Sequence, residues 1–164
     1  LAAAGLTHDI ADVRAGAAHR LKRFPRLVCC LQQTMDDVSN ICDTVVSGLR
    51  SALEAEVDGD AAAAMVDVLQ EMSFMQIVAA GQALAAVGFR HQRADVRRRV
   101  AFLFSWIVEG GRNAMELIKE HRDLQRKVIS ELNKALMKES DGETRRVMAR
   151  ALKHVKYPHN DPCP

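Results

Sequence analysis

Apolar residues recur at intervals of three and four along most of this chain, which is the spacing of one face of an α-helix. The pattern is clearest over residues 95–109, where Asp95 opens the segment as an N-cap or first-turn acid and Gly110-Gly111 supplies a left-handed stop. The apolar positions of this segment are Val96, Val100, Leu103, Phe104, Ile107 and Val108. We expect a long helix with these side chains in the core.

Further helices are expected on both sides of this segment. Residues 112–121 fit a short helix, 123–140 a longer one and 144–155 a last one, with a turn at 141–143. The predicted stripe of the longer helix is Leu124, Val128, Leu132, Leu136 and Met137. The acidic stretch EAEVDGD, residues 54–60, is expected to be a solvated turn between two helices, because it lacks the spacing of a calcium loop.

The long helix has relatives elsewhere in the chain. At an offset of 48 residues, Val100, Phe104 and Ile107 align with Met148, Leu152 and Val155. Aligning Val13 with Val96 also places Arg14 over Arg97, Ala18 over Ala101 and Leu21 over Phe104. Residues 60–72 form a weaker copy, with Met65, Val66, Leu69 and Met72 on its stripe. Repeats of this period indicate an α-solenoid; the alternative is chance similarity between amphipathic helices.

The segment DVRRRVAFLFSWIVEGGRNAMELIKEHRDLQRKVISEL resembles an armadillo repeat, or a HEAT repeat close to that type. The parts that carry the resemblance are the long helix, the Gly pair, Asn113 near the start of a short helix, and a following longer helix. The resemblance is specific over 95–155 and loose over 9–90. It implies an all-α, right-handed α-solenoid in one domain, residues 1–157, followed by a flexible tail at 158–164.

Composition agrees with an all-α fold. The chain is 48% apolar but only 4% aromatic, and helix-forming residues dominate. Apolar runs are too short to span a bilayer, so no membrane association is expected. Cys29, Cys30, Cys42 and Cys163 show no C-x-x-C spacing, which favours buried thiols in a reducing compartment and an intracellular, cytoplasmic location. The first residue is Leu1, so we expect a fragment of a longer chain.

Residue types give no indication of catalysis. The sequence shows no histidine pair at i, i+4, no H-E-x-x-H motif, and no obvious pairing of a nucleophile with a base. His159, Asp161 and Cys163 cluster in the tail, but a flexible terminus explains them better than a metal site does. We therefore expect a protein that is not an enzyme and needs no metal or cofactor.

The expected function is a scaffold that binds a protein partner, one carrying an acidic segment, on a concave helical face. The candidate contact residues occupy the non-core positions of two long helices: Arg98, Phe102, Trp106, Arg146, Arg150 and His154. Two structural alternatives stay open. The arginines could form local pairs with Asp95 or Glu143, and Trp106 could pack against a neighbouring repeat. RNA or DNA binding by the arginine-rich face is the alternative function, and self-association is also expected because solenoid ends expose apolar surface.

Overall fold

The computed structural model describes residues 2–23, 35–73, 77–110 and 119–156. Within these ranges every regular element is a helix, so the all-α prediction is confirmed for the described residues. The elements are α1 (Ala2–Leu6), α2 (Ala11–Leu21), α4 (Met35–Ala55), α5 (Gly59–Ser73), α6 (Ile77–Val87), the 3-10 helix η1 (Gly88–Arg90), α7 (Ala94–Gly110), α9 (Lys119–Lys138) and α10 (Gly142–Lys156).

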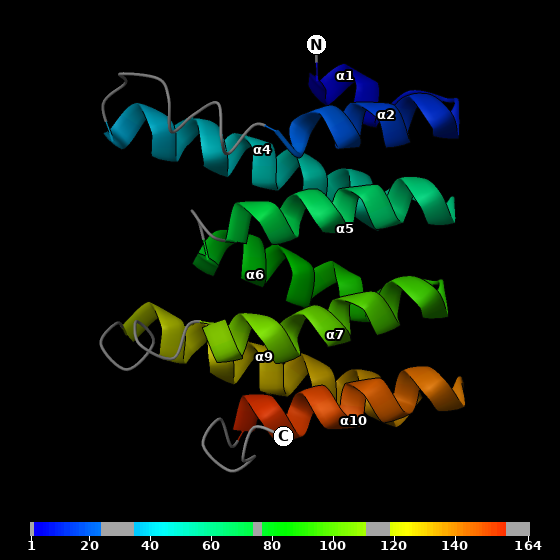
Figure 1. Ribbon diagram of the computed structural model, residues 1–164, viewed down its shortest axis with the longest axis vertical. Coiled ribbons are helices and arrows are strands. Elements are labelled where there is room, and N and C mark those ends of the chain that lie inside the picture. Colours follow the sequence, from blue (N-terminus) through cyan, green and yellow to red (C-terminus); the bar gives the residue numbers. More distant parts are fainter. Residues whose placement is uncertain (1, 24–34, 74–76, 111–118, 157–164) are drawn as a thin grey trace.

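The helices stack in two layers along the longest axis of the molecule (Figure 1). Helices α2, α5, α7 and α10 form one layer and run in the same direction, whereas α4, α6 and α9 form the other layer and run in the opposite direction. In the first layer α2 packs on α5, α5 on α7 and α7 on α10, and in the second layer α4 packs on α6 and α6 on α9. The principal contacts between the layers join α5 to α4 and α6, and α10 to α9. The four segments that align in sequence are thus the four helices of the first layer.

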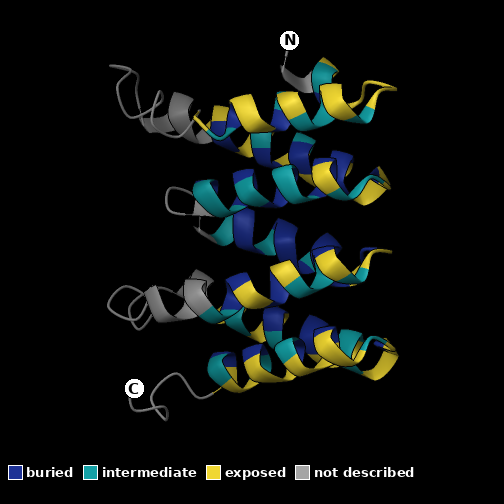
Figure 2. Ribbon diagram, turned by 45° about the vertical axis from the view of Figure 1, so that its right-hand side comes forward, coloured by how far each residue is buried: buried dark blue, intermediate teal, exposed yellow. Residues whose placement is uncertain are grey.

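The core lies between the layers and follows the predicted apolar stripes. On α7, Val96, Val100, Leu103 and Phe104 are buried, and the Phe104 ring lies 5.3 Å from that of Phe89. The stripe predicted for residues 60–72 is also buried, in α5. Figure 2 shows that buried residues concentrate in α6 and the central helices, while α2 and α10 at the two ends of the stack expose more of their surface.

Two sequence-based expectations about burial were wrong. Met137 was placed on the core stripe of α9, but 87% of its surface is exposed, because the buried stripe runs through Leu124, Val128 and Leu132 and leaves Met137 on another face. Glu56 was placed in a solvated turn, but it is buried at the end of α4. Residues 112–118 of the predicted short helix and the tail at 158–164 lie outside the described residues. Residues 119–121 belong to α9, so the boundary predicted between the short and the longer helix at residue 122 is wrong.

Candidate functional site

The arginines at the start of α7 are paired with carboxylates. Arg97 contacts Glu139, Arg98 contacts Glu143 and Arg99 contacts Asp67, which also lies 3.5 Å from the Lys22 ammonium. Just before the helix, Arg93 pairs with Asp95 and Arg90 with Glu131. The carboxylates come from α5, from α7 itself, from α9, from α10 and from the connection between α9 and α10. These pairs therefore join α7 to its neighbours, and much of its positive charge is neutralised within the protein.

The Arg97 guanidinium makes the most enclosed of these contacts. Its Nε and Nη2 donate to the two oxygens of Glu139 at 2.6 and 2.7 Å, and its Nη1 donates to the carbonyls of His91 and Gln92. Only 1% of the Glu139 side chain is exposed. The hydrogen bond from Arg97 lowers the pKa of Glu139 and outweighs the opposing effect of burial. This bidentate pair fixes the end of α9 against the start of α7.

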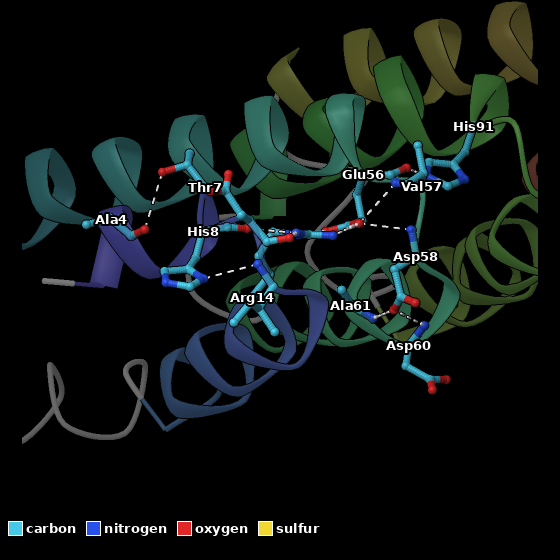
Figure 3. Close-up of polar contacts among 12 residues, drawn as sticks. Ala4, Thr7, His8, Arg14, Glu56, Val57, Asp58, Asp60, Ala61 and His91 are labelled. Carbon is cyan, nitrogen blue, oxygen red and sulfur yellow. Dashed lines mark hydrogen bonds and ion pairs between the residues drawn. The ribbon is translucent and has the colours of Figure 1, made fainter.

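The same arrangement occurs once more, between α2 and the end of α4 (Figure 3). Arg14 donates from Nε and Nη2 to Glu56 at 2.5 and 2.8 Å, and from Nη1 to the carbonyls of His8 and Asp9. Its hydrogen bond to Glu56 likewise lowers the pKa of that carboxyl. In both copies the arginine precedes the glutamate by 42 residues. We call these two contacts the Arg–Glu locks.

The locks have a clear sequence signature that the predictions from helical periodicity missed. Residues 8–14 and 91–97 share the pattern H-x-x-A-D-V-R, and residues 52–59 and 135–142 share A-L-x-x-E-x-D-G. Arg14 was aligned correctly with Arg97, but Glu56 was assigned to a solvated turn and was not matched with Glu139. Extending the alignment of Val13 with Val96 along the whole chain would have brought both glutamates to equivalent positions.

His91 links the two copies to each other. Its Nε2 lies 2.9 Å from the carbonyl oxygen of Glu56, which can only accept, and its Nδ1 accepts the Arg93 backbone N–H at 3.2 Å. These partners require the neutral ring with the proton on Nε2. The side chain is buried, and this burial lowers the pKa of His91. No role was predicted for His91 from the sequence.

The predicted contact residues lie on the adjacent helices α7 and α10. Phe102 is 55% exposed, and Arg146 and Arg150 are exposed on α10. Arg98 is only partly exposed because it pairs with Glu143, which is one of the local pairs that the sequence had left open. His154 is half-buried. Trp106 belongs to α7, but its side chain lies outside the described residues.

Helix α10 differs from α7 in what its cations contact. Glu143 is its one acidic residue, whereas the basic side chains are Arg145, Arg146, Arg150, Lys153 and Lys156. Within the described part of the chain, Arg145, Arg146 and Arg150 form no ion pair with a carboxylate. The positive charge that remains for another molecule is therefore concentrated on α10 rather than on α7.

The described residues contain no group of three histidine, cysteine or acidic side chains arranged to hold a metal ion. No helix in the same ranges is long and apolar enough to cross a membrane. Cys42 is a buried thiol, as expected for that residue, and the other cysteines lie outside the described ranges. The geometry that stands out is thus structural and electrostatic: two internal locks, and a basic helix beside an exposed phenylalanine.

No protein-family model matches the chain, and no curated protein matches it significantly.

Proposed function

We propose that this chain is a non-catalytic scaffold of armadillo/HEAT-like repeats that binds a protein partner inside the cell, in the cytoplasm. Support for a right-handed α-solenoid comes from the two-layer stack and from the Arg–Glu lock that recurs with it. Stacked helical repeats present a long outer surface, which suits recognition of another protein.

One observation carries the proposed binding surface: the unpaired Arg146 and Arg150 lie on the helix next to the exposed Phe102. An arginine whose donors are not used within the protein can bind a carboxylate with two parallel hydrogen bonds. An exposed aromatic ring supplies apolar contact area, and aromatic and arginine side chains dominate binding energy at interfaces. The partner is therefore an acidic segment that carries a bulky apolar residue.

Charge reversal on α10 tests this proposal. We expect Arg146→Glu together with Arg150→Glu to abolish recovery of specific partners from native cell extract, while wild-type protein retains them. The matched control is Arg122→Glu with Lys127→Glu, which reverses two exposed charges on α9 in the other layer. Quantitative mass spectrometry compares the three proteins, and circular dichroism checks that each is folded. Equal recovery by all three proteins would exclude α10 as the binding surface.

Nucleic-acid binding is the second candidate, and Arg145, Arg146 and Arg150 of α10, which form no ion pair within the described residues, favour it. Pairing of the arginines on α7 supports the protein-binding function instead, because a nucleic-acid site needs several cations free for phosphates. A labelled single-stranded RNA distinguishes the two. A shift at about 50 mM salt that disappears with rising salt would favour RNA.

A further inference from the structure

Each Arg–Glu lock lines a groove, and the two grooves lie at the same edge of the stack. The first groove has a volume of about 630 Å³ and lies between α4 and the connection from α1 to α2. The second has a volume of about 820 Å³ and lies between α9 and the connection from η1 to α7. Most lining positions correspond when the two copies are aligned. The grooves therefore have the same backbone frame and differ mainly in their side chains.

Those side chains give the two grooves opposite charge. Thr7, Ser51 and Ala55 line the first groove, and at the equivalent positions of the second groove stand Arg90, Lys134 and Lys138. Without counting histidines, four cations and two carboxylates line the second groove, for a net charge of +2. One cation and two carboxylates line the first, for a net charge of −1.

Glu131 fixes two cations of the second groove, Arg90 and Lys134, and both side chains still expose N–H groups that can bind a ligand. Glu131 is buried and accepts from Arg90 Nη2 at 2.5 Å and from Lys134 Nζ at 2.9 Å. Burial acts to raise the pKa of Glu131, but hydrogen bonds from Lys134 and Arg90 outweigh it and keep the pKa low. The side chains of Arg90 and Lys134 are 65% and 62% exposed. Lys138 is exposed and forms no ion pair within the described ranges.

An apolar contact lies beside these cations. Met137 is the most exposed large apolar side chain among the described residues, and it lines the second groove together with Ala135. Leaving a methionine in water forgoes the free energy of burying it, and its flexible thioether adapts to many shapes. Because Met137 adjoins Lys138 and Lys134 on the last turns of α9, one ligand can contact all three.

We propose that the second groove binds an acidic peptide segment of a partner protein, with carboxylates on Arg90, Lys134 and Lys138 and an apolar side chain on Met137. This inference rests on the proposed protein-binding function but uses a surface separate from the α10 arginines. Charge complementarity identifies the occupant. A nucleic-acid backbone fits less well, because the neighbouring groove on the same edge carries net negative charge.

The test uses the full chain and a fluorescein-labelled peptide of glutamates around one central leucine, with binding followed by fluorescence anisotropy at about 50 mM salt. We expect Lys134→Glu with Lys138→Glu to weaken binding by about tenfold or more, because like charges then face each other. Ser51→Glu with Ala55→Glu places the same charges in the first groove and is the matched control, which leaves binding unchanged. Replacing the central leucine by glycine weakens binding to wild type but not to Met137→Ser.

Three results would overturn the proposal: no binding to wild type, equal loss in the two double variants, or loss only in Arg146→Glu with Arg150→Glu. The last result would place the acidic ligand on α10 and leave the proposed function standing. Conversely, the peptide could bind the groove while the α10 variant keeps all its protein partners. That result would support the proposed groove site and exclude α10 as the binding surface. Circular dichroism and thermal melting of each variant separate loss of binding from loss of folding.

Discussion

His91 makes folding stability depend on pH near neutrality. Burial lowers its pKa in the folded protein, so below about pH 6.5 the unfolded chain takes up a proton that the folded chain does not. Stability therefore falls as the pH drops, by at most about 1.4 kcal/mol per pH unit for this one group. His91→Gln keeps an N–H for the Glu56 carbonyl but does not titrate, so we expect a flatter slope.

Urea unfolding of wild type and His91→Gln between about pH 7.5 and 5.5 measures this slope. The Arg–Glu locks do not interfere in that window. The lowered pKa values of Glu56 and Glu139 mean that the stability they contribute is complete above about pH 4.3 and is lost only as the pH falls further. An identical slope in the two proteins would show that His91 is not the group that titrates.

At the scale of the elements, Gly88 sets how closely η1 approaches α7. A Cβ on Gly88 would lie 2.5 and 2.9 Å from the two γ-carbons of Val100, a buried and stiff side chain. We expect Gly88→Ala to lower the free energy of unfolding by about 1–3 kcal/mol. Gly16→Ala is the control, because its Cβ would meet no atom within 4 Å inside α2 and should stabilise by about 0.5–1 kcal/mol. Urea denaturation measures both, and a stable Gly88→Ala protein would contradict the close approach.

The sequence predicted the elements well wherever periodicity alone decides burial. Helix α7 begins and ends within a residue of the predicted segment, and the stripe of α5 is buried as expected. Met137 was misplaced because its neighbour Leu136 continues the stripe, and one further residue rotates the side chain by about 100° onto another face. The contact residues Arg98, Phe102, Arg146 and Arg150 were placed on accessible faces, but their binding role stays a prediction.

At the scale of the whole molecule, the principal contacts join neighbouring helices. A substitution that destabilises one end of the stack should therefore leave the stability of the other end unchanged. Glu139→Gln leaves Arg97 partly buried without its charge partner, which typically costs about 3 kcal/mol. We expect faster hydrogen exchange in α9 and α10 and unchanged exchange in α1 and α2. Glu143→Gln removes an exposed pair and serves as the control. Uniform acceleration along the chain would mean that the stack unfolds as one unit.

The two ends of the stack present different surfaces. Ile10 and Val13 are exposed at the α2 end, whereas α10 exposes mainly basic side chains at the other. Apolar residues at an end are where the expected self-association would occur, and this stays a prediction. The basic end disfavours a second copy of itself, because like charges would then face each other.

The sequence by itself determined the all-α class and the faces of α5, α7 and α10 that are buried, because helical periodicity and residue propensity are local properties. Only the tertiary structure decided which cations are left for a partner. Arg97 and Arg98 are alike in sequence, but one lies against Glu139 and the other against Glu143 only once α9 and α10 pack beside α7. Such pairing depends on the distance in space between residues that are more than 40 positions apart in the sequence. A local sequence pattern does not predict that distance.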